Sequence, residues 1–249
     1  MSAVRIFLDT GAGTSLVSSE LAKELELKIL GSKEGQSAGG KVAVSLARVD
    51  SIAIGEIKLE YVDVGIVDLS HIAKTIDARI DGDLGYNFLR HFGITINYRD
   101  YEICFDDPQR IEDFRNVSKA EVPIRSANPA KPLILVAVHA NGRGPFQFAV
   151  DTGTSTSAIT PELAKQLGVT GSPIGPVTTG GAHTDVAAGA LQSFMGGGAE
   201  IENMAVVVAD FFAMLSHAVG AQLDGIVGYN FLHNYKVVID YPNELLRLF

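Results

Sequence analysis

Two short stretches of the chain decide its fold. Residues 6–15 read IFLDTGAGTS, and residues 148–157 read FAVDTGTSTS. In each, a run of apolar residues ends in Asp-Thr-Gly and continues into a turn rich in Ser and Thr. A single Asp-Thr-Gly is a weak signal, because these residue types are common in turns. Two copies in equivalent surroundings predict that Asp9 and Asp151 come from related halves of the chain and meet at a pseudo-two-fold axis.

The sequence beyond these two copies repeats as well. Residues 18–25 (SSELAKEL) match residues 160–167 (TPELAKQL), at the same offset of 142 that separates the two aspartates. Residues 80–89 (IDGDLGYNFL) match residues 223–232 (LDGIVGYNFL) at an offset of 143. Similarity that keeps its order and spacing is typical of an internal duplication. The pattern predicts two homologous lobes, residues 1–118 and 119–249, with a linker near residues 106–132, where prolines interrupt regular structure.

Turn and strand signals predict an all-β fold with short helices. The chain has 249 residues, of which 47% are hydrophobic, 20% are charged and 26 are Gly, as expected for a globular protein with many turns. Two apolar runs on either side of Asn141-Gly142 predict a hairpin before the second Asp-Thr-Gly. Ser18 and Thr160 are suited to cap the short helices that follow the Asp-Thr-Gly turns.

The two lobes are not expected to be equal. Lobe two has the hairpin of residues 132–150 before its Asp-Thr-Gly, whereas only eight residues precede Asp9. Either the start of the gene lies upstream, or lobe one lacks a strand. A missing strand would leave an open sheet edge that invites pairing with another chain.

The residue types of the repeated tripeptide suit one kind of chemistry. Glycine at positions 11 and 153 lets the backbone turn sharply and donate its amide to the carboxylate. The hydroxyls of Thr10 and Thr152 can bond across the interface between the lobes. Two carboxyls ~3 Å apart cannot both ionise, so one stays protonated while the other can take a proton from a water molecule.

A second element supports this interpretation. Leu84-Gly85 and Val227-Gly228 resemble the hydrophobic-hydrophobic-Gly element that crosses beneath the aspartate loop in retropepsin-like proteases. With both elements, nearly the whole chain resembles a bilobal aspartic protease of the retropepsin or pepsin type. The resemblance implies two acid-protease-like β-barrel lobes. It also implies an aspartic endopeptidase that hydrolyses peptide bonds with a water activated by paired aspartates and that needs no cofactor.

The resemblance assigns roles residue by residue. The catalytic roles fall on Asp9 and Asp151, and the crossing loops contain Gly85 and Gly228. The supporting roles fall on Thr10, Gly11, Thr152, Gly153 and Thr154.

Some positions depart from the family pattern. Position 83 is Asp, where the family usually has an apolar residue. Ala12 is typical of retroviral enzymes, whereas Thr154 is typical of pepsins. We expect the hydroxyl of Thr154 to donate an additional hydrogen bond to Asp151, which would make Asp151 the more acidic of the pair.

Flaps that cover the aspartates are expected in two glycine-rich segments. These are residues 35–48 and 178–189, and ordinary hairpin loops are the alternative interpretation. Neither segment contains a tyrosine, which favours flaps of the retroviral type. The candidate flap residues are Gly39, Gly40, Gly180 and Gly181.

Other classes of function are disfavoured. A net charge of −9 argues against a nucleic-acid partner. The single cysteine, Cys104, and six scattered histidines offer no metal-ligand spacing, so no metal site is expected. No apolar stretch is long enough to span a membrane. The serines near the aspartates lack the Gly-x-Ser-x-Gly setting of serine hydrolases.

The expected partner is a peptide or protein substrate. A monomer is sufficient for catalysis because one chain supplies both aspartates, while a dimer through the incomplete edge of lobe one is a further option. The alternative function is a catalytically weak peptide-binding module that keeps the aspartic protease fold. The sequence leaves the compartment open: cytoplasmic, or exported if the true N-terminus lies upstream.

Overall fold

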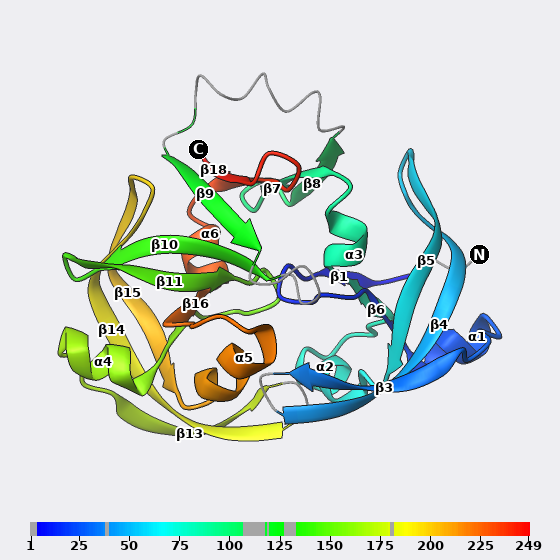
Figure 1. The fold of residues 1–249 in the computed structure, drawn as a ribbon, viewed down its shortest axis with the longest axis horizontal. Coiled ribbons are helices and arrows are strands. Elements are labelled where there is room, and N and C mark those ends of the chain that lie inside the picture. The colour runs from blue at the N-terminus through cyan, green and yellow to red at the C-terminus, as the bar shows by residue number, and fades with distance from the viewer. Residues whose placement is uncertain (1–3, 38–39, 107–117, 119, 127–132, 180–181) are drawn as a thin grey trace.

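The structure, a computed structural model, describes residues 4–37, 40–106, 118, 120–126, 133–179 and 182–249. Two β-rich lobes lie side by side, and a further group of strands runs across both of them on one side (Figure 1). The predicted all-β fold with short helices is confirmed. The predicted boundary between residues 118 and 119 stays a prediction, because most of the segment around it lies outside the described residues.

Lobe one, the chain up to β8, contains a six-stranded sheet with the order β1-β6-β2-β5-β4-β3. Its short strands β1, β6 and β2 follow one another at one end of this order, and β3, β4 and β5 form long hairpins. The strands are β1 (Ile6–Leu8), β2 (Leu16–Ser18), β3 (Gly31–Ser37), β4 (Gly40–Ile54), β5 (Ile57–Val67) and β6 (Gly82–Leu84).

Lobe two, from β9 onward, repeats this order. Six of its strands follow one another as β13-β14-β15-β12-β16-β11, the counterparts of β3-β4-β5-β2-β6-β1. The predicted hairpin before the second Asp-Thr-Gly is present as β10 and β11. The strands are β10 (Ile134–Ala140), β11 (Arg143–Val150), β12 (Ala158–Ile159), β13 (Ser172–Thr179), β14 (Ala182–Gly196), β15 (Ala199–Ala209) and β16 (Gly225–Val227).

The remaining strands bridge the lobes in the order β9-β18-β17-β7-β8. They are β7 (Gly93–Asn97), β8 (Glu102–Asp106), β9 (Ala120–Ser126), β17 (Lys236–Asp240) and β18 (Leu245–Leu248). In the antiparallel pair of β7 and β17, Thr95 lies opposite Val238, which is its own equivalent 143 positions later. The pseudo-two-fold axis therefore passes between these two residues, through the bridging sheet.

Short helices connect the strands in equivalent places. They are α1 (Ser19–Glu24), α2 (Ser70–Thr75), α3 (Tyr86–Leu89), α4 (Pro161–Leu167), α5 (Phe212–Val219) and α6 (Tyr229–Leu232). The predicted caps are present: Ser18 Oγ accepts a hydrogen bond from the Leu21 amide at 3.1 Å, and Thr160 Oγ1 accepts one from the Leu163 amide at 2.9 Å. Each cap satisfies an amide that the helix itself leaves unpaired.

The lobes differ at the edge of the central strand. In lobe two, β11 pairs with β16 on one side and with β10 on the other. In lobe one, β1 pairs with β6, and no second partner strand is found among the residues that the structure describes. The expected open edge of lobe one is therefore present in the described part of the chain.

The main hydrophobic core is shared by the two lobes. It includes Phe88 and Ile94 from lobe one and Phe148, Phe231 and Leu248 from lobe two. All five side chains are almost completely buried. Burial of apolar surface is the dominant favourable contribution to folding, so the lobes stabilise each other as well as themselves.

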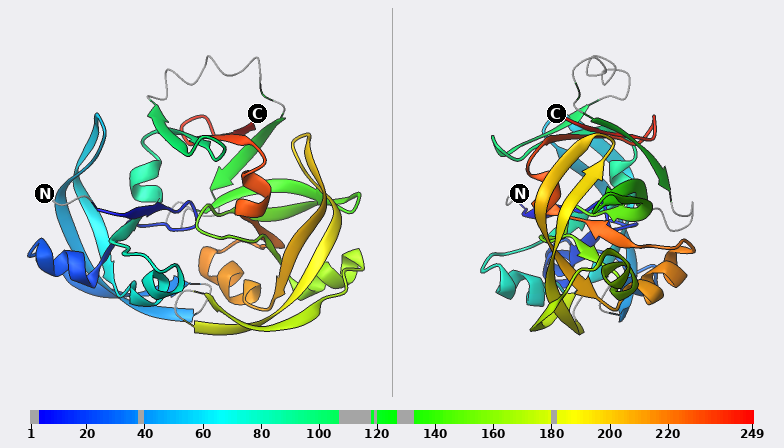
Figure 2. Two further views of the ribbon diagram at one scale, coloured as in Figure 1. Left: turned by 180° about the vertical axis from the view of Figure 1, so that it is seen from behind. Right: turned by 90° about the vertical axis from the view of Figure 1, so that its left-hand side faces the viewer.

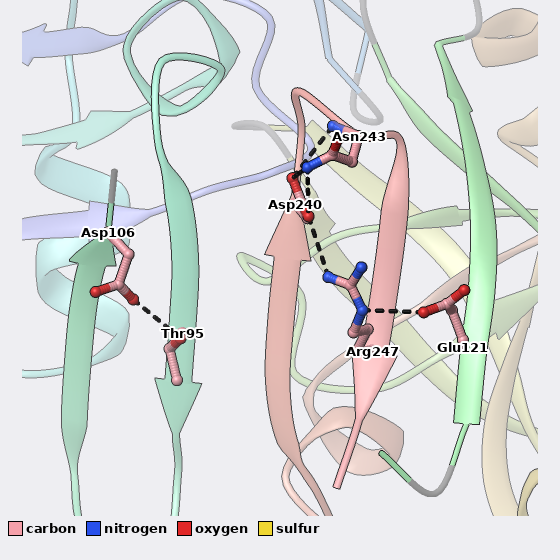
Figure 3. A network of polar contacts seen from close by, with 6 residues as sticks. All are labelled: Thr95, Asp106, Glu121, Asp240, Asn243 and Arg247. Carbon is pink, nitrogen blue, oxygen red and sulfur yellow. Dashed lines mark hydrogen bonds and ion pairs between the residues drawn. The ribbon is translucent and has the colours of Figure 1, made fainter. Parts of the chain in front are cut away.

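A buried ion-pair network ties three strands of the bridging sheet together (Figure 3). The fully buried Arg247 on β18 binds Asp240 on β17 and Glu121 on β9, both at 3.0 Å. Asp240 also accepts hydrogen bonds from the amide and side chain of Asn243. These partners compensate a guanidinium that would be costly to bury alone.

Candidate active site

The two Asp-Thr-Gly turns begin where the central strands of the lobes end. The Asp9 amide donates to the carbonyl of Leu84 at 3.0 Å, and the Asp151 amide donates to the carbonyl of Val227 at 3.0 Å. β1 runs parallel to β6, and β11 runs parallel to β16. Asp9 and Asp151 therefore follow the same end of equivalent strand pairs. Each lobe thus presents one aspartate at the interface between the lobes.

The two threonines hold the turns together by reciprocal hydrogen bonds. The Thr10 hydroxyl donates to the carbonyl of Val150 at 2.8 Å and accepts from the Thr152 amide at 3.1 Å. The Thr152 hydroxyl donates to the carbonyl of Leu8 at 2.6 Å and accepts from the Thr10 amide at 3.1 Å. Each hydroxyl therefore bonds to the backbone of the opposite lobe, which fixes the two turns relative to each other.

The two glycines leave room for the carboxyl groups. A Cβ atom added to Gly11 would lie 2.7 Å from Cγ of Asp151, and one added to Gly153 would lie 2.9 Å from Cγ of Asp9. Each glycine therefore lies against the carboxyl of the other lobe. The pKa of each carboxyl also depends on the other carboxyl. Asp9 and Asp151 form one pair, called the dyad from here on.

Backbone amides donate hydrogen bonds to the carboxyls of the dyad. Asp9 Oδ1 accepts from the amides of Gly11 at 2.8 Å and Ala12 at 3.1 Å, and Asp151 Oδ1 accepts from the Gly153 amide at 2.8 Å. Burial raises the pKa of Asp9, and the amides partly oppose that shift. Burial, followed by the charge of Asp9, raises the pKa of Asp151 well above its usual range. The pair therefore keeps one proton at a pH where an isolated aspartate has lost it.

The expected hydrogen bond from the Thr154 hydroxyl to Asp151 is not found among the described residues, and the greater acidity of Asp151 stays a prediction. Burial raises the pKa of both Asp9 and Asp151. The Thr154 backbone amide does donate to Asp151, but Ala12 supplies an equivalent amide to Asp9. Within the described residues, the Thr154 hydroxyl makes no hydrogen bond to Asp151. Its methyl group instead faces Gly228, where an added Cβ would lie 2.5 Å away.

A serine and an asparagine, not recognised in the sequence analysis, support the turn of lobe one. Asn87 Oδ1 accepts from the amide of Ser15 at 2.7 Å and from its hydroxyl at 2.9 Å. The Ser15 hydroxyl in turn accepts from the Gly85 amide at 3.0 Å, and Asn87 Nδ2 donates to the carbonyl of Asp63 at 2.7 Å. This chain of bonds links the Asp-Thr-Gly turn to the crossing loop and to β5.

Lobe two contains the same chain of bonds. Asn230 Oδ1 accepts from the amide and hydroxyl of Ser157 at 2.8 and 2.7 Å, and Ser157 Oγ accepts from the Gly228 amide at 3.0 Å. Asn230 Nδ2 donates to the carbonyl of Ala205 at 2.7 Å. The signal was present in the sequence, since the same Ser and Asn recur at equivalent positions of both lobes.

The crossing loops pass close beneath the turns. A Cβ added to Gly85 would lie 2.8 Å from the carbonyl oxygen of Ala12, and one added to Gly228 would lie 2.9 Å from the carbonyl oxygen of Thr154. The amides of Tyr86 and Tyr229 donate to these two carbonyls at 2.8 and 2.9 Å. Only a residue without a side chain permits this approach.

The candidate flap segments lie in two long hairpins, β3–β4 and β13–β14. These hairpins lie on the side of the molecule opposite the bridging sheet and run toward each other, as seen from both directions (Figures 1 and 2). Gly40 is the first residue of β4, whereas Gly39, Gly180 and Gly181 lie outside the described residues. The flap role of these glycines stays a prediction.

Comparison with known families supports the resemblance seen in the sequence. A model of the aspartyl protease family matches residues 2–88 and 136–231, which include both Asp-Thr-Gly turns and both crossing loops. The chain belongs to the aspartyl protease family. Because each matched segment covers the corresponding part of one lobe, both lobes of this aspartyl protease family member are of the same type.

Solved structures with similar folds include two that cover different shares of the chain. A retropepsin-like aspartic protease from Rickettsia conorii is 23% identical, with a TM-score of 0.38, and the match covers 51% of this chain and 89% of that one. Basic 7S globulin from soybean is 10% identical, with a TM-score of 0.48, and the match covers 98% of this chain and 87% of that one. A comparison with curated proteins gave no match. Family membership rests on the family match, since both overall similarities are low.

Two further observations concern cofactors and membranes. In the described ranges, no group of three or more His, Cys, Asp or Glu side chains is arranged to hold a metal ion. Among the helices in the part of the chain that the structure describes, none is long and apolar enough to cross a membrane.

Proposed function

We propose that the protein is an aspartic endopeptidase that hydrolyses peptide bonds with a water molecule activated by Asp9 and Asp151. One observation carries the proposal: two equivalent turns place the carboxyls of Asp9 and Asp151 together at the interface of the lobes, with the glycine of each turn against the carboxyl of the other. The reciprocal threonine bonds fix the relative position of the carboxyls before substrate arrives. Such preorganisation lowers the cost of reaching the transition state.

The pKa directions assign the two carboxyls different roles in the first step. We take Asp151 as the protonated acid and Asp9 as the carboxylate, because the negative charge of Asp9 is among the causes that raise the pKa of Asp151. Asp9 takes a proton from water as the water oxygen bonds to the scissile carbonyl carbon. Asp151 gives its proton to the carbonyl oxygen. The product of this step is a tetrahedral diol, with Asp9 now protonated and Asp151 ionised.

The second step breaks the carbon–nitrogen bond. Asp9 gives its proton to the departing amine nitrogen, and one hydroxyl of the diol returns its proton to Asp151. The products are a carboxylic acid and an amine, and the dyad regains its starting protonation. No metal or cofactor enters these steps, and a single chain supplies both carboxyls.

The proposed substrate is a peptide that lies across the dyad between the lobes. The hairpins β3–β4 and β13–β14 would cover it from the side opposite the bridging sheet. We assign them the flap role because they occupy equivalent places in the two lobes and lie on the side of the molecule opposite the bridging sheet (Figure 1).

Peptide cleavage by matched variants tests the proposal. A peptide library is incubated at several pH values with the wild type, Asp9→Asn, Asp151→Asn and a control, Asp77→Asn, which changes an exposed turn residue. We expect cleavage by the wild type and by the control, and a loss of at least about a thousandfold in each dyad variant.

Binding of the inhibitor pepstatin, measured in parallel, separates the two functions considered. Binding of pepstatin and peptides by a wild type that does not cleave them would replace the enzyme with a peptide-binding module. Cleavage that survives in both dyad variants would contradict the proposed mechanism altogether.

A further inference from the structure

The two lobes differ at one buried position next to the dyad. β6 carries Asp83 where β16 carries Ile226. Each is the middle residue of a three-residue strand, and their exposed fractions are 8% and 7%. Asp83 lies between Phe7 on β1 and Leu16 on β2, so it occupies the centre of the small sheet that carries Asp9. One lobe thus has a carboxyl at the place where the other has an aliphatic side chain.

The surroundings of this position are apolar in both lobes. Ile226 belongs to a buried cluster that includes Ala158, Val186, Ala209 and Phe211. The positions 142 residues earlier hold Leu16, Val44, Val67 and Leu69, which form the corresponding cluster of lobe one. Asp83 therefore replaces the isoleucine of an otherwise apolar group.

Asp83 has little to compensate its burial. Its Oδ1 accepts a hydrogen bond from the Leu16 amide at 3.0 Å, and no other hydrogen bond to this carboxyl is found among the described residues. A carboxylate with one donor in apolar surroundings is poorly solvated, so the neutral acid is the favoured form. Burial, followed by the charge of Asp9, raises the pKa of Asp83 to about 8.

Asp9 is the charged group that raises the pKa of Asp83. The residue after Asp83, Leu84, accepts the hydrogen bond of the Asp9 amide at 3.0 Å, which fixes the start of the Asp-Thr-Gly turn to β6. Other charged groups on neighbouring elements are Arg5 before β1 and His71 and Lys74 on α2, and none of them shifts the pKa of Asp83.

The charge of Asp9 also acts on a tyrosine, Tyr241. Burial, then Tyr86 and then Asp9 raise the pKa of Tyr241 above its usual range. Tyr241 stays neutral throughout the range in which Asp83 titrates. Changes of charge around Asp9 within that range therefore do not come from Tyr241.

We infer that Asp83 is a positioning residue of the proposed protease: a third carboxyl that acts through Asp9 and sets the upper limit of the pH range of activity. The inference rests on the proposed function. While Asp83 is protonated, the three carboxyls carry one negative charge, and Asp9 uses it to activate water. Ionisation of Asp83 adds a second negative charge beside Asp9. That charge opposes the negative charge that develops on the substrate carbonyl oxygen, so activity falls.

The pH dependence of kcat/KM in matched variants tests this inference. The variants are Asp83→Asn, which keeps the shape without the charge, and Asp83→Ile, which gives lobe one the residue of lobe two. Ile226→Val is the control, because it alters the equivalent apolar cluster without adding or removing a charge. We expect the alkaline limb of the wild type to lie near pH 8 and to move up by at least about one pH unit in both Asp83 variants. The acid limb should stay in place, and the control should keep the wild-type profile.

An unchanged alkaline limb in folded Asp83→Asn and Asp83→Ile would overturn the inference. A limb that moved equally in Ile226→Val would do the same, since packing rather than charge would then be the cause.

A second measurement does not depend on activity. Carbon-13 NMR of labelled aspartate carboxyls should show one group titrating near pH 8 in the wild type and absent in Asp83→Asn, with the Asp9 signal responding at the same pH. The stability of the fold should change in parallel. The folded protein binds a proton at Asp83 that the unfolded chain has lost above about pH 4, so stability falls as the pH rises toward 8. This fall should be smaller in Asp83→Ile.

The two sets of results separate the inference from the proposed function. A wild type that cleaves no peptide, but in which the titrations of Asp83 and Asp9 are linked, would refute the enzyme and retain the electrostatic coupling. A wild type that cleaves peptides, with no carboxyl titrating near pH 8, would retain the enzyme and refute the role of Asp83.

Discussion

The parts of the two lobes that hold the dyad are nearly identical, whereas their surroundings differ. Both lobes have the reciprocal threonine bonds, the serine–asparagine support and the glycine crossing loop. They differ in the partner of the central strand and in the residue at positions 83 and 226. The comparison indicates that both lobes use the same contacts to position the dyad, whereas the charge beside each aspartate and the pairing of each central strand differ. Substitutions made in matched pairs can test whether the duplicated parts contribute equally.

The largest effect is expected at the glycines of the Asp-Thr-Gly turns. An alanine Cβ would lie 2.7 Å from the opposite carboxyl in Gly11→Ala and 2.9 Å in Gly153→Ala, so the carboxyl must move. Displacement of a catalytic group by about 1 Å lowers kcat by about a hundredfold. We expect similar losses in both variants when peptide cleavage is measured. Gly31→Ala is the control, because its added Cβ meets nothing within 4 Å. A variant that kept full activity would break the equivalence of the lobes.

The next effect is expected from the reciprocal threonines. Valine at position 10 leaves the carbonyl of Val150 and the amide of Thr152 without their partner, which should lower the free energy of unfolding by about 2–4 kcal/mol. Thr152→Val should cost somewhat less, since Thr10 is 1% exposed and Thr152 is more open to water. Urea unfolding measures both. The double variant should lose less than the two single losses together, because the two hydroxyls form one network; strict additivity would contradict that.

A smaller effect is expected from the serine–asparagine support. Asn87→Ala and Asn230→Ala each remove a side chain that makes three hydrogen bonds, two of them partly buried and one exposed to solvent. We expect each to lower the free energy of unfolding by about 1–2 kcal/mol and to lower kcat more than KM rises. The two costs should agree within about 0.5 kcal/mol. A cost confined to one lobe would show that the repeated sequence has lost its role in the other.

The smallest effect is expected at Thr154. Its hydroxyl makes no hydrogen bond to Asp151 in the described structure, so Thr154→Ala should leave the acid limb of the pH–rate profile where it is and change stability by less than about 0.5 kcal/mol. Ala12→Thr provides the matched change in lobe one. An acid limb displaced in Thr154→Ala alone would restore the acidifying role expected from the sequence.

Much of the fold was predictable because the segments that define a lobe occur twice in the sequence. The duplicated Asp-Thr-Gly and crossing-loop segments predicted two lobes, and caps such as Thr160 predicted where short helices begin. Support by Ser15 and Asn87 was missed, although both recur in lobe two, because their partners lie about 70 residues away and are defined only by the fold.

The hydrogen bond from the Thr154 hydroxyl to Asp151 was predicted wrongly for a different reason. Residue type and spacing do not say which way a side chain turns, and its methyl group is directed at Gly228. The departure at Asp83 was visible in the sequence, but its chemical meaning depends on the apolar cluster around it and on the nearby charge of Asp9. Both are properties of the folded chain.

The mismatch between Asp83 and Ile226 has a consequence for how such a molecule can evolve. In an assembly of two identical subunits, every mutation appears on both sides of the symmetry axis, so a carboxyl beside one aspartate would be accompanied by a second beside the other. Two such acids would add a repulsion that a single one avoids. Fusion of the halves into one polypeptide lets each side accumulate its own substitutions.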